Sequence, residues 1–285
     1  MLLGNWSVRI GGLVLALLLV VALAAPWLGT VDPTLFDAAS RDLRPGEAGE
    51  ITTLDGDMVK HVFLMGSDSY GRDIYSRVLY GTRVSLAVGL AAALVALAFG
   101  ILAGLVAGYI RWADGVLMRV MDGIMALPDL LLAITFVALT GASVRNVIIA
   151  LVIPQTPRVV RLVRGVVLSL REQPFVEASV ALGAGLGRTV LRHVLPNTVA
   201  PLIVQGTYVC ASAILIEAAL SFLGAGTPAE IPSWGNIMAE ARAHVRVAFW
   251  LLLFPGLFLA STVLSINLLG DGLRDLLDPR LARLM

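Results

Sequence analysis

Residues 84–109 read VSLAVGLAAALVALAFGILAGLVAGY and contain no charged side chain. A helix that crosses a bilayer needs roughly 20 consecutive, mostly apolar residues. This stretch is long enough, and Ser85 and Tyr109 are its only polar side chains. It therefore predicts a membrane-spanning helix and places the chain among membrane proteins.

The composition of the whole chain agrees with this prediction. The 285 residues are 58% hydrophobic and 14% charged, with a mean hydropathy of +0.87, whereas soluble domains carry about 25% charged residues. The net charge of +1 argues against nucleic-acid binding, which needs a basic excess. Lys60 is the only lysine and follows Val59, so the phosphate-binding pattern G-x-x-x-x-G-K-S/T cannot occur.

Five further stretches are long and apolar enough to cross a membrane, at residues 10–28, 115–139, 147–167, 196–223 and 247–269. The sequence thus predicts an all-α, polytopic protein with about six transmembrane helices. Arg119, Asp122 and Pro128 divide the third stretch, and Pro154 and Pro157 interrupt the fourth. The first stretch also resembles a secretory signal, but Pro26 would directly follow the cut, and a retained anchor helix is favoured.

The strongly polar tract is residues 29–83, which hold nine acids and six bases. With the amino terminus in the cytoplasm, twelve bases lie inside and nine outside, and six of those nine belong to this tract. The positive-inside rule then predicts cytoplasmic termini and an external insert. The expected division is an anchor (1–28), an insert with an interfacial helix over 71–83, a transmembrane domain (84–270) and a cytoplasmic tail (271–285).

A second polar tract, residues 168–195, lies between the fourth and fifth spans. We expect a short helix after Pro174, a turn at Gly183, Gly185 and Gly187, and a helix restarting over 189–194 that Pro196 ends or bends. A short knob with one acid, Glu177, and apolar neighbours suits a groove on another protein.

This tract carries a family resemblance. Glu177-Ala178-Ser179, Gly183 and Leu195-Pro196 resemble the E-A-A-x-x-x-G-x9-I-x-L-P loop of permeases in binding-protein-dependent ABC importers. Ser179 replaces the second alanine, and His193 stands at the isoleucine position.

Three other stretches are similar to the dipeptide, oligopeptide and nickel branch of that family. They are Gly66-Ser-Asp68-Ser-Tyr-Gly71-Arg72-Asp73, Ser233-Trp234-Gly235-Asn236 and Asn267 to Arg280, with the core Gly270-Asp271-Gly272. Together the resemblances cover residues 60–283.

The resemblance implies the type I importer permease fold and a non-catalytic subunit in a prokaryotic inner membrane. It implies a sister permease, two ATP-binding subunits that hold ATP and magnesium, and an external binding protein that delivers small peptides or related solutes. In that family the loop at 168–195 is the coupling helix, which docks into the ATP-hydrolysing subunit. The residues carried over to this role are Glu177, Ala178, Ser179, Gly183, His193, Leu195 and Pro196.

Other polar residues have two interpretations each. Glu217 either lines the translocation path and meets a peptide amino group or is paired locally. Asp68, Arg72, Asp73 and Trp234 are candidate contacts of the binding protein, and Trp234 is also a candidate interfacial anchor.

Three arginines near the inner boundary, Arg158, Arg161 and Arg164, are expected to neutralise lipid headgroups or neighbouring acids. Cys210 is expected to be a small buried hydrophobe. The three histidines are isolated in sequence, so no metal site is expected.

Two other functional classes remain as alternatives. An ion-coupled secondary transporter would need several intramembrane charges and an internal repeat, and only Glu217 is a clear candidate. An intramembrane enzyme would need a catalytic constellation, and no G-x-S-x-G motif occurs.

Overall fold

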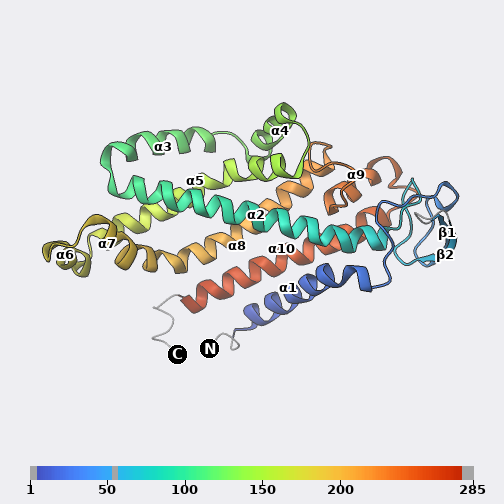
Figure 1. Ribbon diagram of the computed structural model, residues 1–285, viewed down its shortest axis with the longest axis horizontal. Coiled ribbons are helices and arrows are strands. Elements are labelled where there is room, and N and C mark those ends of the chain that lie inside the picture. The colour runs from blue at the N-terminus through green and yellow to red at the C-terminus, as the bar shows by residue number, and fades with distance from the viewer. Residues whose placement is uncertain (1–4, 53–56, 278–285) are drawn as a thin grey trace.

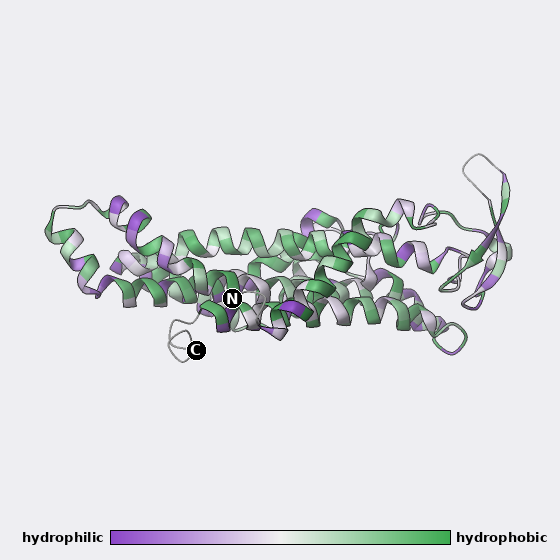
Figure 2. Cartoon of the chain, turned by 90° about the horizontal axis from the view of Figure 1, so that it is seen from below, coloured by the Kyte–Doolittle hydropathy of each residue, from purple (hydrophilic) through white to green (hydrophobic). Residues whose placement is uncertain are grey.

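The computed structural model describes residues 5–52 and 57–277. Long helices run side by side along one axis, with a β-hairpin at one extreme and a small helical knob at the other (Figure 1). The long helices are α1 (Trp6–Ala24), α2 (Ile74–Tyr109), α5 (Val144–Arg171), α8 (Leu195–Phe222) and α10 (Trp250–Leu277). Apolar residues dominate their middle sections, and polar residues gather towards both extremes (Figure 2).

The shorter elements lie mainly around the ends of this bundle. They are α3 (Arg111–Met125), α4 (Asp129–Thr140), α6 (Pro174–Ala181), α7 (Leu186–Thr189), α9 (Trp234–His244), the 3-10 turns Ala25–Trp27 and Ala38–Ser40, and the π-turn Val190–Val194. Strands β1 (Glu47–Thr52) and β2 (Met58–Phe63) form an antiparallel hairpin in which Glu47 pairs with Phe63. We call residues 29–52 and 57–77 with α9 the hairpin end, and residues 174–194 the knob.

The number of spans agrees with the prediction once a bent pair is counted. Five helices of the described residues are long and apolar enough to cross a membrane, and α3 with α4 makes a sixth if the pair is one span. The expected division of the 115–139 stretch is confirmed, because α3 and α4 lie on either side of Pro128 and meet at 89°. Pro128 lacks an N–H group and disfavours helical geometry in Leu127, so the helix breaks there.

The fourth span, by contrast, is not interrupted. Pro154 and Pro157 both lie inside the continuous helix α5. Both rings are buried, so tertiary packing holds the helix together where each proline removes a backbone hydrogen bond.

Glycines allow α2 and α5 to approach closely. Gly100, Gly104 and Gly108 recur every four residues on α2, and a Cβ atom at any of them would lie under 3.0 Å from a valine of α5. These valines are Val159, Val163 and Val167. The small-residue spacing therefore creates a tight helix–helix contact of the kind common in membranes.

The start of α2 differs from the sequence-based expectation. A separate interfacial helix over 71–83 is wrong, because α2 begins at Ile74 and continues without a break to Tyr109. Ile74 and Val78 are fully buried against the chain's own core. Nothing at residues 74–83 breaks a helix, and Gly81 packs near Trp234, so the segment joins the bundle.

Helix α1 packs on α10. A Cβ atom at Gly11 would meet the backbone of Ser265 and Leu269, and one at Gly272 would meet Val8. Helix α10 continues to Leu277, past the expected boundary of the tail, and residues 278–285 of that tail, with Arg280 and Arg283, lie outside the described residues.

Candidate functional site

The knob has the predicted helix–turn–helix form. Helix α6 begins at Pro174 and ends near Gly183, which adopts φ +85°, a conformation natural to glycine. The N–H of Ala184 donates to the Ser179 carbonyl at 3.0 Å and closes the turn. Pro196 does not end the helix, because helical backbone continues from α7 through the π-turn Val190–Val194 into α8. The π-turn directly before Pro196 is the local departure from α-helical geometry.

The knob belongs to a tract that is polar in sequence, yet several of its exposed side chains are apolar. Leu182 is 89% exposed, and four other large side chains are also exposed: Phe175, Val180, Leu186 and Leu191. Glu177 is exposed beside them, whereas Val176, Thr189 and Val194 are buried and fasten the knob to the bundle. His193 is half-buried, and its ring lies 6.2 Å from the ring of Phe175.

An exposed cluster of this kind carries no stabilisation in the isolated chain. Isolated exposed leucines are ordinary, but a contiguous apolar group on a short projection is typical of a protein interface. The motif residues Glu177, Ala178, Ser179 and Gly183 all lie on or beside it, and Leu195 follows at the start of α8.

The three arginines of α5 pair with neighbouring acids, which was one of their two interpretations. Arg158 contacts Asp129 at 2.7 Å and Arg161 contacts Asp122 at 2.5 Å. Arg164 pairs with Asp114. These ion pairs tie α5 to both arms of the bent α3–α4 pair.

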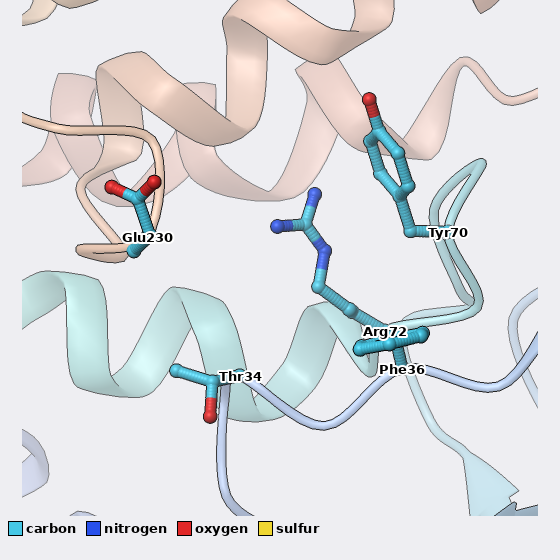
Figure 3. A pocket seen from close by; sticks show the side chains of 5 residues that line it. All are labelled: Thr34, Phe36, Tyr70, Arg72 and Glu230. Carbon is cyan, nitrogen blue, oxygen red and sulfur yellow. The ribbon is translucent and has the colours of Figure 1, made fainter.

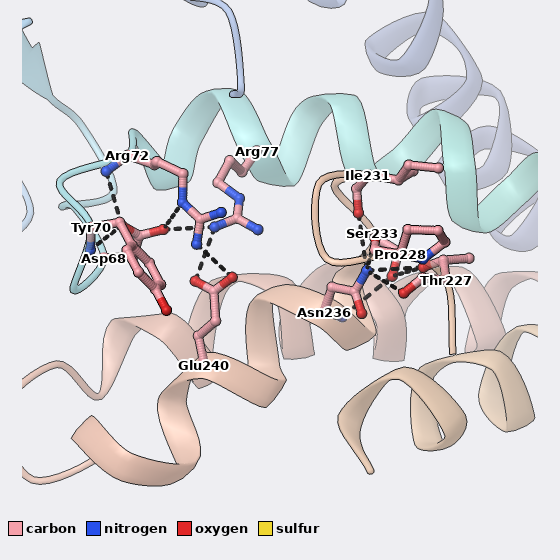
Figure 4. A network of polar contacts seen from close by, with 10 residues as sticks. All are labelled: Asp68, Tyr70, Arg72, Arg77, Thr227, Pro228, Ile231, Ser233, Asn236 and Glu240. Atoms are coloured by element: carbon pink, nitrogen blue, oxygen red, sulfur yellow. Dashed lines mark hydrogen bonds and ion pairs between the residues drawn. The ribbon is translucent and has the colours of Figure 1, made fainter. Parts of the chain in front are cut away.

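The hairpin end contains a buried network of four charged residues (Figure 4). Arg77 contacts Asp68 at 2.6 Å and Glu240 at 2.9 Å. Arg72 contacts the same two acids, each at 2.6 Å. Arg77 is 1% exposed and Asp68 is 0% exposed, whereas Arg72 and Glu240 keep partial exposure, so the network runs from the interior to the surface.

The network shifts the pKa values of its acids in opposite directions. Burial opposes ionisation of Asp68, but Arg77 and Arg72 outweigh it, and the pKa of Asp68 is lowered. Burial raises the pKa of Glu240, and the charge of Asp68 adds to the rise, although Arg77 and Arg72 oppose it. Asp68 is therefore the firmly ionised member of the network.

Sequence reasoning missed Arg77 and Glu240 as partners. They lie 163 positions apart, and no local spacing connects them. The only available signal was that Arg77 falls on the apolar side of a segment entering the bilayer, where an unpaired charge is costly.

Three of the four predicted binding-protein contacts are buried within the chain. Asp68 and Trp234 are fully buried, and Asp73 is 2% exposed. Asp73 caps α2 by accepting a hydrogen bond from the Ser76 N–H at 2.9 Å, and the indole N–H of Trp234 donates to the Val78 carbonyl at 3.2 Å.

For these three residues a surface contact is wrong in this conformation, and Trp234 is not an interfacial anchor. The Asp73 carboxylate caps a helix, and the Trp234 indole donates to a buried carbonyl, so both side chains stabilise the fold of the chain itself. Arg72 retains partial exposure, with its guanidinium over the Tyr70 ring at 4.7 Å.

A second polar network surrounds Asn236, whose amide group donates to the loop after α8 (Figure 4). Its nitrogen lies 2.9 Å from the Pro228 carbonyl and 3.0 Å from the Ile231 carbonyl. It also lies 2.9 Å from the Thr227 hydroxyl. One side chain thus fastens the whole 227–231 loop against α9.

Glu217 lies behind this loop. It is 0% exposed, and its Oε1 accepts a hydrogen bond from the Ser221 hydroxyl at 2.8 Å. The local-pairing interpretation therefore describes this conformation, while a role on the translocation path stays a prediction.

Two cavities open at the hairpin end. The smaller, of about 230 Å³, is lined by Thr34, Phe36, Tyr70, Arg72 and Glu230 (Figure 3). The larger, of about 730 Å³, lies between α9, the loop that begins at Gly224 and the turn after α4, and Tyr70 borders both. The described residues contain no cluster of three or more His, Cys, Asp or Glu side chains that could hold a metal ion.

Comparison with known proteins places this architecture in a family. Residues 85–283 match the family described as "Binding-protein-dependent transport system inner membrane component". The chain belongs to this family of importer permeases. It is accordingly a multi-pass membrane protein, and the family assignment does not favour an ion-coupled secondary transporter.

Curated relatives extend over nearly the whole chain. A protein of Sinorhizobium fredii named "Probable peptide ABC transporter permease protein" is 49% identical, over 97% of this chain and 90% of the relative. The di/tripeptide transport system permease of Pseudomonas aeruginosa is 44% identical, over 95% and 88%. The glutathione transport system permease of Escherichia coli is 43% identical, over 93% and 84%.

A solved structure confirms the fold. An inward-facing structure of the MetNI methionine ABC transporter superposes with a TM-score of 0.54 and 19% sequence identity, over 68% of this chain and 93% of that chain. The chain therefore has the fold of an ABC importer permease, and α1 and both strands of the hairpin lie outside the family match at residues 85–283.

Proposed function

We propose that this chain forms half of the translocation path of an ATP-driven importer for small peptides, with a sister permease as the other half. Relatives above 40% identity are named for peptide, di/tripeptide and glutathione transport. These solutes share a peptide backbone with charged termini. The proposed substrates are therefore short peptides with free termini.

The knob is the proposed docking element for an ATP-hydrolysing subunit. The observation that carries the proposal is the exposed apolar cluster around Leu182, which rests on a rigid, internally fastened helix–turn–helix. Docking in a groove of the partner would remove this surface from water. The knob continues through the π-turn Val190–Val194 directly into α8, so its displacement would move that span.

The hairpin end would then face outside and meet the loaded binding protein. Knob and hairpin lie at opposite extremes of the bundle (Figure 1), which suits partners on opposite sides of the membrane. The proposed location is the inner membrane of a prokaryote, with both termini in the cytoplasm. ATP and magnesium would bind the partner subunits.

Two knob variants test the docking proposal. Glu177→Arg reverses the exposed charge, and Gly183→Trp places a bulky side chain where the backbone has φ +85°. Both should lose co-purification with the ATPase subunits and peptide-stimulated ATP hydrolysis. Asp275→Arg is the matched control, because Asp275 is also exposed but lies near the end of α10, outside residues 168–195.

The result that would overturn the proposal is normal assembly and normal peptide-stimulated hydrolysis in both variants. Loss of assembly in Asp275→Arg as well would mean that the overall charge of the chain, and not the motif, governs the contact.

A further inference from the structure

The larger cavity at the hairpin end has the size and lining of a ligand site. Its volume of about 730 Å³ falls within the range of about 300–1,000 Å³ typical of small-molecule pockets. Glu240, Arg242 and His244 of α9 contribute to its wall, together with Thr227 and Gly224 from the loop after α8. Nothing in the proposed docking role of the knob uses this cavity.

Arg242 is the distinctive side chain of this wall. Its Nε donates to the Ala239 carbonyl at 3.0 Å, and its guanidinium lies 5.5 Å from the centre of the Phe222 ring. Both contacts orient the group without neutralising it. Within residues 5–52 and 57–277 it forms no ion pair, whereas Arg72 and Arg77 each contact two acids.

Gly224 leaves room in front of this guanidinium. It has φ +84°, and an added Cβ atom would lie 3.9 Å from Nη2 of Arg242. Gly224 therefore has two effects. It permits the left-handed backbone, and it places no side chain between the loop and the terminal nitrogens of Arg242.

The charge balance around the cavity favours an anion. The buried network contributes two acids, Asp68 and Glu240, against two bases, Arg72 and Arg77, so its formal charge is zero. On the cavity wall itself, Glu240 is already paired with Arg72 and Arg77, whereas the exposed Arg242 has no acidic partner among the described residues. A planar guanidinium binds a carboxylate through two parallel hydrogen bonds, which makes a carboxylate the matching ligand.

We propose that this cavity receives the peptide on its way into the translocation path and that Arg242 binds the peptide's carboxyl terminus. The inference rests on the proposed peptide transport and adds a specificity-determining residue to it. Peptides share a terminal carboxylate whatever their side chains, so one arginine on the permease can serve many sequences.

The test compares one peptide with its carboxyl-terminal amide. The complete importer is placed in proteoliposomes, and each peptide is supplied on saturated binding protein after its affinity for that protein has been measured separately. A charge-assisted hydrogen bond contributes about 1.5–3 kcal/mol, or roughly ten- to a hundredfold. Wild type should therefore import the free acid at least about tenfold more efficiently, and Arg242→Ala should abolish this preference while Arg242→Lys retains part of it.

A second pair of variants leaves Arg242 in place. Ala239 lies three residues before Arg242 on α9 and also lines the cavity, so Ala239→Asp would pair with the guanidinium and occupy it. It should abolish the preference as Arg242→Ala does. Ala239→Asn has nearly the same shape without the charge and should keep the preference.

Several results would overturn the inference. Equal slowing of acid and amide by Arg242→Ala would assign the residue to binding-protein contact or to folding. Equal import of both peptides by wild type, or an unchanged preference in Arg242→Ala, would exclude a carboxylate contact. Import of neither peptide by wild type would overturn peptide transport itself, which separates that failure from failure of the Arg242 assignment.

Discussion

The two ends of the molecule differ in how their charged and apolar side chains are placed. At the hairpin end, charged side chains are buried and paired, as Arg77 is with Asp68 and Glu240. At the knob, apolar side chains stand in solvent, as Leu182 does at 89% exposure. The charged network of the hairpin end finds its partners within the chain, although apolar side chains such as Phe36 and Met58 are also exposed there. The exposed apolar side chains of the knob form the surface proposed to meet an ATP-hydrolysing subunit. Mutations should therefore affect folding at the first end and assembly at the second.

The largest expected effect is loss of stability on Arg77→Ala. The change leaves Asp68, which is fully buried, and Glu240 with one arginine between them. Breaking a buried ion pair from one side costs about 3–5 kcal/mol, so the thermal unfolding midpoint of the purified chain should fall steeply. Arg188→Ala on the exposed knob is the control and should leave the midpoint unchanged. A small effect of Arg77→Ala would mean that water enters the network.

Asn236→Ala should have the next largest effect. It removes a donor that holds the Thr227, Pro228 and Ile231 carbonyls. Buried acceptors left without partners cost about 1–3 kcal/mol, so the unfolding free energy should drop by about 2 kcal/mol. Asn197→Ala is the matched control, because Asn197 is exposed and its amide donates only to the His193 carbonyl. Equal losses in the two variants would contradict the buried-network account.

At the knob, Leu182→Ser should weaken assembly without changing stability. Burying a leucine contributes about 2 kcal/mol, so affinity for the ATPase subunit should fall roughly 30-fold. Leu64→Ser at the hairpin end, where Leu64 is 57% exposed, should not alter that affinity. Titration of the ATPase onto the permease in nanodiscs measures both variants, and matching losses would mean that the knob is not the docking element.

The smallest expected effect is a pH dependence at the hairpin end. The pKa of Asp68 is lowered in the folded chain, so its contribution is fully present above the ordinary aspartate value of about 3.9. That contribution disappears as the pH falls through the depressed pKa. The difference in unfolding midpoint between wild type and Asp68→Asn should shrink over the same range. A difference that is independent of pH would assign the effect of the substitution to geometry instead of charge.

The contrast between the ends also explains which sequence predictions succeeded. Local signals were sufficient for the knob, since Pro174 starts α6 and Gly183 ends it. They were also sufficient for the long apolar helices. They failed where long-range packing decided the outcome, as with Pro154 and Pro157 inside α5 and with the buried indole of Trp234.

The same limit applies to the hairpin-end site. Asp68, Arg72 and Asp73 were selected by local motif as surface contacts, yet Asp68 and Asp73 are buried, and Arg72 pairs with Glu240 from a distant part of the chain. Glu240 became visible only when the fold brought α9 against the start of α2. The proposed role of Arg242 depended on the fold as well, because only the structure places this arginine on the cavity wall opposite Gly224.

The most direct test of the central claim is photo-crosslinking from the two ends of the assembled importer. A photoreactive residue at position 182 on the knob should crosslink to an ATP-hydrolysing subunit, and one at position 64 at the hairpin end should not. Crosslinking to the ATPase from position 64, or its absence from position 182 in an importer that hydrolyses ATP, would contradict the assignment of the knob as the docking element.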